Sequence, residues 1–109
     1  MISGDLQNVQ VWVATTSVDM RKSFDGLAEV VRNFLGHDPL SGNLFVFRNR
    51  GGHRVKILWW DRDGLAIYYK RLERGEFQFP RAGTPAVAIT REQLLRLLSG
   101  LNLVERKRA

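Results

Sequence analysis

The 109-residue sequence contains no cysteine, only two histidines and no long apolar run. The absence of cysteine excludes disulfide bonds and zinc sites with thiolate ligands. Because no stretch of about 18 apolar residues occurs, we expect no membrane-spanning helix and no membrane partner. The first residues, MISGDLQNVQVWVATT, do not combine a basic segment with an apolar stretch as signal peptides do. These absences favour a cytoplasmic protein.

The positive charge of the chain is concentrated in its middle. The net charge is +6, and most of the 17 basic residues are arginine, which matches phosphate geometry better than lysine does. Residues 1–47 hold three basic and five acidic residues, whereas residues 48–81 hold nine basic and four acidic residues, a net of +5. A basic segment within a small domain is expected of a nucleic-acid-binding protein. Solubility or an acidic protein partner would explain the same charge.

The length and the 44% hydrophobic content predict a single domain over residues 1–109, with a core over about 8–103 and a basic tail at 104–109. Hydrophobic periodicity and turn residues predict strands at 9–16, 43–48, 54–60, 65–71 and 86–89 and helices at 19–35 and 91–99. Thr90 and Gln93 form the capping box that opens the second helix. This order predicts an α+β fold, an antiparallel β-meander with an N-terminal strand and long helix and a C-terminal helix packed on the sheet.

The stretch ILWWDRDGLAIYY predicts a β-hairpin with a three-residue loop at 62–64. Asp61 suits the first position of a type I turn, and Gly64 suits the left-handed position that follows. In this register Trp59 lies opposite Ile67. Since neighbouring residues on a strand point to opposite sides, the register decides which aromatic side chains enter the core.

The predicted register divides the hairpin into a core face and a second face. The core face is expected to carry Val55, Ile57, Trp59, Leu65, Ile67 and Tyr69. The second face is expected to carry Arg54, Lys56, Leu58, Trp60, Ala66, Tyr68 and Lys70, with Lys56 opposite Lys70. Rings beside cations can stack on bases and hold phosphates. A covering helix or a second subunit would account for the two rings of the second face equally well.

Two functional hypotheses follow from this second face, DNA binding and docking of a protein partner. The candidate DNA-binding residues are Arg48, Arg50, Arg54, Lys56, Lys70 and Arg71. The candidates for base stacking or for partner docking are Trp60 and Tyr68. Like charges directly opposite each other destabilise a sheet, so a Lys56–Lys70 pair would gain from a bound anion. Homo-oligomerisation is left open.

The sequence offers no catalytic residues, no metal ligands and no sign of a cofactor. Asp61 and Asp63 are expected to be structural, because an aspartate at a turn accepts hydrogen bonds from backbone N–H groups. A calcium loop that began at Asp61 would need a glutamate at its twelfth position, where Leu72 stands. His37 and His53 lie in separate polar loops without ligand spacing. We therefore expect a protein that is not an enzyme.

Three segments carry a resemblance to a known family: SVDMRKSFDGLAEVV, DPLSGNLFVFRNRGGHRVKILWWDRDGLAIYYKRLERGEFQFP and AITREQLLRLLSGL. Over roughly residues 8–103 the chain resembles the TnpB accessory protein of the insertion sequence 66 family of bacterial transposable elements. Ser23 stands where that family usually has glycine, and Trp59 where it often has tyrosine.

The resemblance implies an accessory role in transposition, beside a separate transposase that carries the acidic catalytic residues. It brings no catalytic residues to this chain. We therefore expect an accessory protein that binds DNA without catalysis to assist the transposase. The alternative is an adaptor that docks the transposase or another accessory protein without contacting DNA.

Overall fold

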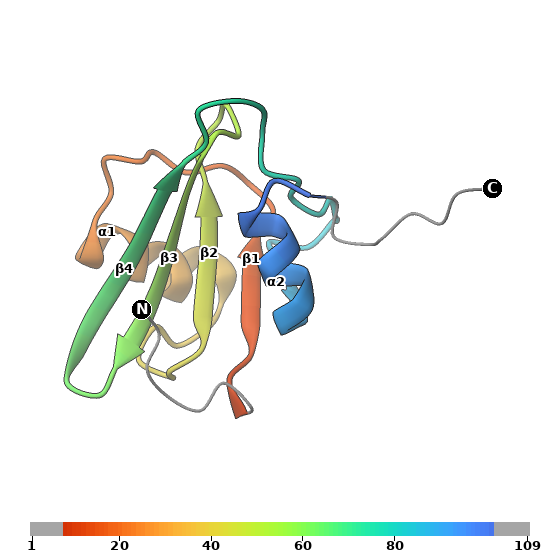
Figure 1. Cartoon of the computed structure of the whole chain (residues 1–109). Helices are drawn as coiled ribbons and strands as arrows, with labels where there is room; N and C mark the ends of the chain where they lie inside the picture. The colour runs from red at the N-terminus through yellow and green to blue at the C-terminus, as the bar shows by residue number, and fades with distance from the viewer. Residues whose placement is uncertain (1–7, 102–109) are drawn as a thin grey trace.

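The computed structural model describes residues 8–101, which form a five-stranded sheet with helices on its two faces (Figure 1). The elements are β1 (Val11–Ala14), α1 (Phe24–Glu29), η2 (Val30–Leu35), β2 (Leu44–Arg48), β3 (Arg54–Asp61), β4 (Gly64–Arg71), β5 (Ala86–Ile89) and α2 (Arg91–Leu98). The predicted α+β class is confirmed, whereas the predicted basic tail at 104–109 lies outside the described residues. No helix within residues 8–101 is long and apolar enough to cross a membrane.

The sheet is mixed, with the strand order β4-β3-β2-β1-β5. The strands β2, β3 and β4 form the expected antiparallel meander, and β5 pairs antiparallel with β1. The prediction of an antiparallel sheet is wrong for β1 and β2, which run parallel. The physical reason is the helical segment between them, which carries the chain back along the sheet so that β2 starts at the same end as β1.

Each face of the sheet has its own hydrophobic cluster. The helical segment α1–η2 covers one face, where the buried side chains are Ala14, Leu27, Ala28, Val31, Leu35, Phe45, Phe47 and Leu58. Helix α2 covers the other face, where they are Val11, Val13, Leu44, Val46, Val55, Ile57, Trp59, Phe77, Leu94 and Leu97. Because successive side chains of a strand point to opposite sides, β2 supplies both clusters and is buried throughout its apolar length. We call the two sides the α1 face and the α2 face.

The helix predicted at 19–35 begins later, at Phe24. Asp19 instead closes a turn, since its Oδ1 accepts a hydrogen bond from the backbone N–H of Arg21 at 2.9 Å and its carbonyl accepts one from Lys22 at 3.0 Å. The helical segment ends as expected at Gly36, which takes a left-handed φ of 74°. The capping box between Thr90 and Gln93 is also confirmed at the start of α2.

The predicted register of the β3–β4 hairpin is wrong by one residue. Asp61 lies opposite Gly64 and Trp59 opposite Ala66, so the loop is two residues long rather than three. The positive φ that the prediction assigned to Gly64 is adopted by Arg62, at 59°. Across Arg62 the backbone N–H of Asp63 donates to the carbonyl of Asp61 at 2.6 Å. A tight turn centred on an arginine is not what turn preferences favour, which is why the sequence pointed to glycine.

The one-residue slip moves every side chain of β4 to the opposite face. Tyr68 therefore lies on the α2 face with Trp59, whereas Ile67 lies on the α1 face. The predicted two faces are thus wrong for β4, and Lys56 lies opposite Tyr69 rather than Lys70. Val55 lies opposite Lys70, and the like-charge pair of the hairpin is Arg54 opposite Arg71.

Candidate nucleic-acid interface

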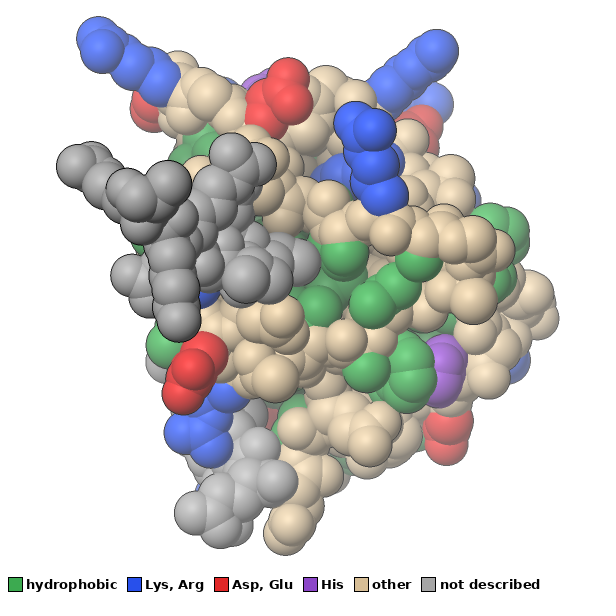
Figure 2. All heavy atoms as spheres, turned by 90° about the vertical axis from the view of Figure 1, so that its right-hand side faces the viewer, with side chains coloured by type: hydrophobic (Ala, Val, Ile, Leu, Met, Phe, Trp, Pro, Cys, Tyr) green, Lys and Arg blue, Asp and Glu red, His purple; other side chains and the backbone are tan. Residues whose placement is uncertain are grey.

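The six predicted DNA-binding residues gather at one end of the sheet, but on both of its faces. This end is formed by the end of β2, the start of β3 and the end of β4, beside the loops 49–53 and 72–85 (Figure 1). Figure 2, which views the molecule from the β5 side, shows Lys and Arg side chains standing out at this upper end, next to acidic ones. We call it the arginine end. Its cations differ sharply in how much of their charge reaches the surface.

The ammonium group of Lys56 is buried and bonded within the protein. The side chain is only 8% exposed, and Nζ donates to the carbonyls of Met20 at 2.7 Å and Lys22 at 2.8 Å. Nζ also lies 4.8 Å from the centre of the Tyr69 ring. These contacts fasten the loop before α1 to the sheet. A group enclosed in this way is poorly placed to meet a phosphate, so the contacts of Lys56 give its predicted role in DNA binding no support.

Lys70 has a similar role on the opposite face. Its Nζ donates to the carbonyl of Leu98, the last residue of α2, at 2.7 Å. The last carbonyls of a helix lack partners within the helix, and the negative end of the helix dipole favours a cation there. Lys70 therefore links β4 to the end of α2. The role of Lys70 in DNA binding stays a prediction, and the contacts of its side chain do not support it.

A polar cleft of about 250 Å³ lies between the loop 49–53 and the segment 76–81 at the arginine end. Three arginines line it, Arg48, Arg50 and Arg81, and we call it the arginine cleft. Arg50 and Arg81 are exposed, and neither has a hydrogen bond or ion pair with another described residue. Their guanidinium groups are therefore available to an anion.

Backbone contacts and Arg48 give the arginine cleft its shape. The N–H of Phe77 donates to the carbonyl of Gly52 at 2.8 Å, which joins the two loops. Gly52 has a φ of 78°, a conformation that favours glycine. Arg48 donates from Nη2 to the carbonyl of Thr15 at 3.3 Å and lies 5.7 Å from the ring centre of Phe79. Arg48 is thus held in place while its two exposed neighbours are not.

Arg54 and Arg71 lie at the same end on the α1 face. Arg54 donates from Nη1 to the hydroxyl of Tyr69 at 3.2 Å, and Arg71 forms an ion pair with Glu73 at 3.1 Å. The four residues line an open hollow of about 370 Å³. Because the two arginines are directly opposite in the hairpin, they are the like-charge pair that a bound anion would relieve. Their role in DNA binding stays a prediction.

The two aromatic candidates do not form one surface. Tyr68 is half-buried against the cluster of the α2 face. Trp60 lies opposite Leu65 near the hairpin turn, at the end of the sheet away from the arginine end. A shared stacking or docking platform made by these two rings is therefore absent from the fold, and each could act only separately.

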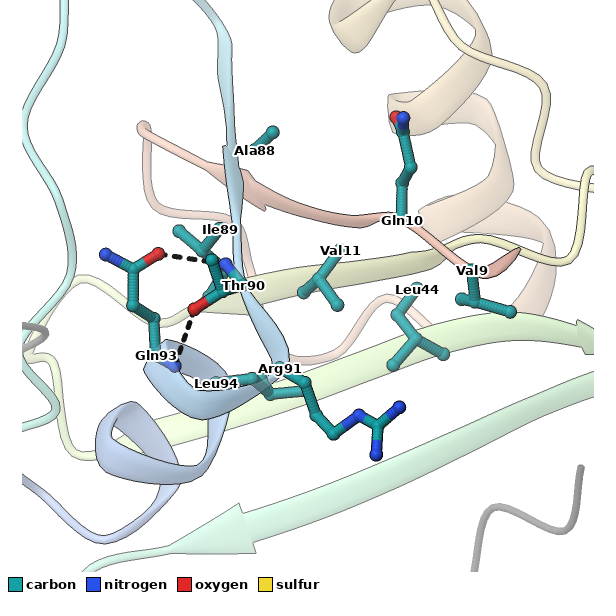
Figure 3. Close-up of a pocket in the computed structure, with 10 residues that line it drawn as sticks. All are labelled: Val9, Gln10, Val11, Leu44, Ala88, Ile89, Thr90, Arg91, Gln93 and Leu94. Atoms are coloured by element: carbon teal, nitrogen blue, oxygen red, sulfur yellow. Dashed lines mark hydrogen bonds between the residues drawn. The ribbon is translucent and has the colours of Figure 1, made fainter. Parts of the chain in front are cut away.

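Sequence reasoning missed an apolar groove at the end of the sheet opposite the arginine cleft. Figure 3 shows Val11 and Leu44 facing it from β1 and β2 and Val9 from the residues before β1, with Arg91 and Leu94 from the start of α2 on the other side. Its volume is about 430 Å³. The groove depends on segments near residues 10 and 90 lying side by side, a pairing that no local pattern indicates. Within residues 8–101 no group of acidic or histidine side chains is arranged to hold a metal ion.

Comparison with known proteins gives matches along almost the whole chain. The sequence model of a family described as IS66 Orf2 like protein matches residues 9–108. The uncharacterized protein y4hO of Sinorhizobium fredii is 49% identical over 96 residues, which cover 88% of this chain and 84% of that protein. The uncharacterized protein y4jC of the same organism is 34% identical over 105 residues, covering 96% and 90%. No solved structure gives a significant match.

Proposed function

Because this chain belongs to the IS66 Orf2-like family of accessory proteins of insertion-sequence transposition, we propose that it binds DNA without catalysis through the arginine cleft and so assists a separate transposase. The observation that carries the proposal is the pair of exposed guanidinium groups of Arg50 and Arg81, which have no partner among the described residues. Guanidinium groups bind phosphate oxygens in a bidentate manner, which makes phosphate the fitting ligand for such a pair.

The chemistry of the cleft supports binding to the DNA backbone rather than reading of base edges. Contacts to phosphates position a protein on DNA but carry no sequence information. The surrounding segment, 48–81, has a net charge of +5, which adds long-range attraction. We therefore expect weak binding that depends little on sequence, with a dissociation constant of about 1 μM or weaker at physiological salt.

The salt dependence of DNA binding tests this proposal. Each phosphate contact contributes about 0.9 to the slope of log affinity against log salt concentration. In fluorescence anisotropy with a mixed-sequence duplex, the double variant Arg50→Gln/Arg81→Gln should bind more weakly and show a slope shallower by about 2. A matched control, Arg32→Gln/Arg62→Gln, removes the same charge far from the cleft and should leave the slope nearly unchanged. Equal effects of the two double variants would contradict a local site.

Glu76 provides a test in the opposite direction, because its carboxylate lines the same cleft. The variant Glu76→Gln removes a negative charge beside the expected phosphate, so DNA should bind more tightly than to the unaltered protein. Weaker or unchanged binding would show that the phosphate lies elsewhere.

A second candidate function, an adaptor for the transposase, is favoured by the apolar groove. Val9 is half-buried and faces this groove, so Val9→Lys places a charge in it while altering only one partly buried side chain. If the groove docks the transposase, co-purification of the two proteins should survive nuclease and high salt and be lost in Val9→Lys. A complex that nuclease removes would instead support the DNA-binding role.

A further inference from the structure

The two edge strands of the sheet differ in how open they are to pairing. The edge strand β5 has four residues and follows Pro85, whereas the edge strand β4 has eight residues. The first six residues of β4, Gly64–Tyr69, carry no charge. Among the described residues, the backbone of β4 pairs only with β3, so its outer edge has no partner. A long uncharged edge of this kind is a template for another strand.

We propose that β4 pairs in an antiparallel manner with β4 of a second copy of this chain, so that two sheets join into one. The charges at the ends of the strand support this choice of partner. Asp63 directly precedes β4, and Lys70 and Arg71 close it. An antiparallel arrangement of two copies brings the acidic end of one strand to the basic end of the other. A parallel arrangement would bring like charges together.

Of the three registers centred on Ala66, Ile67 and Tyr68, the same charges favour one. A two-fold axis perpendicular to a continuous sheet keeps each side chain on its own face, so a residue at the axis must face its own copy. Centring the axis on Ala66 would place Arg62 opposite Lys70, and centring it on Tyr68 would place Asp63 opposite Glu73. Both arrangements set like charges against each other. Centring the axis on Ile67 places Asp63 opposite Arg71, an attractive pair that occurs twice. Asp61 belongs to β3 and already pairs with Gly64, so the repulsive position that it would take opposite Glu73 lies outside the seam.

The apolar side chains of β4 fit this register as well. Tyr69 is 48% exposed although it is a large ring on the α1 face, and Leu65 and Ile67 are half-buried there. With the axis at Ile67, Tyr69 of each copy lies opposite Leu65 of the other. Such cross-strand contacts of an aromatic ring with an aliphatic side chain stabilise a sheet. The ion pair of Arg71 with Glu73 is exposed, so Arg71 can leave Glu73 and pair with Asp63 of the other copy at little cost in free energy.

Single cysteines test the seam directly, because the chain has none of its own. At the axis, the two copies of residue 67 have Cα atoms about 4.5–5.5 Å apart, within the range that a disulfide spans. Ile67→Cys should therefore give a covalent dimer under mild oxidation. Ala66→Cys places its two thiols on residues that are diagonal neighbours, about 7–8 Å apart, and should cross-link much less. Ala88→Cys on β5 is the control for random collision and should not cross-link. Efficient cross-linking through residue 66 or residue 88, with little through residue 67, would overturn the proposal.

A charge exchange tests the register without altering the uncharged residues 64–69 of the strand. Asp63→Arg or Arg71→Asp alone sets like charges opposite each other at both ends of the seam. Each should raise the dimer dissociation constant about tenfold in sedimentation equilibrium. The double variant Asp63→Arg/Arg71→Asp restores opposite charges and should return the constant close to its original value. A monomer at every concentration, or a dimer that neither single variant weakens, would contradict the proposal, and a partner of a different sequence would then be the occupant of this edge.

Discussion

The lysines and the exposed arginines of the arginine end differ in whether their charged groups are bonded within the protein. Lys56 and Lys70 direct their ammonium groups to backbone carbonyls of the loop before α1 and of the end of α2. Arg50 and Arg81 extend from loops and have no partner among the described residues. All four lie in the most basic part of the sequence, yet of these four only the arginines have guanidinium or ammonium groups without a partner among the described residues. Charge counted along a sequence is therefore not the same as charge available at a surface.

Among variants of these lysines and arginines, substitution of Lys56 should lower the free energy of unfolding most. Lys56→Met removes hydrogen bonds to two carbonyls and leaves both without the charged donor. Since hydrogen bonds to charged groups contribute about 1.5–3 kcal/mol each, the free energy of unfolding should fall by about 3 kcal/mol. Urea denaturation measures it, with the exposed Lys22→Met as the control. A loss below about 0.5 kcal/mol, typical of surface positions, would show that Lys56 is not an anchor.

A smaller effect is expected at Lys70, which serves one carbonyl and is less buried than Lys56. Lys70→Met should lower the free energy of unfolding by about 1–2 kcal/mol, through loss of a charged hydrogen bond at a helix end. Hydrogen exchange should show that the loss is local. The variant should increase the amide exchange rates in the last turn of α2 more than those in α1. Equal acceleration in both helices would argue against a local link to α2.

The arginines should behave in the opposite way in the same stability experiment. Arg50→Gln/Arg81→Gln removes no hydrogen bond or ion pair within the described residues, so the free energy of unfolding should change by less than about 0.5 kcal/mol. Urea denaturation beside the lysine variants gives the comparison under one set of conditions. A large destabilisation would mean that these side chains support the loops, and would weaken the case for a phosphate site.

The smallest expected effect is on the pKa of Asp19, which forms an ion pair with the exposed Arg21. The side-chain and backbone hydrogen bonds of Arg21 lower the pKa of Asp19 from 3.8 to about 2. A carboxyl group whose pKa is lower in the folded state stabilises the fold above pH of about 4, and this contribution is lost as the pH falls from about 4 to about 2. An NMR titration of the Asp19 carboxyl should show a pKa near 2, and Arg21→Gln should raise it. A pKa that stays unchanged in the variant would contradict the contact.

Local sequence patterns predicted much of the fold, because the residues that determine each element are neighbours in the chain. The strand at 86–89 has the expected bounds, and the capping box of Thr90 and the end of the helix at Gly36 were found from single motifs. The late start of α1 was not foreseen, since Asp19 bonds to the N–H of Arg21 in a turn before the helix begins.

The register and the site depended on features that no local pattern contains. The hairpin turns at Arg62 instead of at a glycine. As a result, Tyr68 and Tyr69 lie on the faces opposite to those predicted. Lys56 was assigned to the surface because its partners, the carbonyls of the loop before α1, are more than 30 residues away in sequence. Arg81 was overlooked because it lies outside the hairpin, in a segment that folds back beside Arg50.

The most direct test of the DNA-binding account is the salt slope of DNA affinity for two matched double variants, each of which removes two positive charges. Arg50→Gln/Arg81→Gln should make the slope shallower by about 2, because two phosphate contacts are lost. Lys56→Met/Lys70→Met, measured where circular dichroism shows that it is folded, should keep the slope of the unaltered protein. A slope that falls equally in both, or only in the lysine variant, would contradict the claim that the exposed arginines hold the DNA.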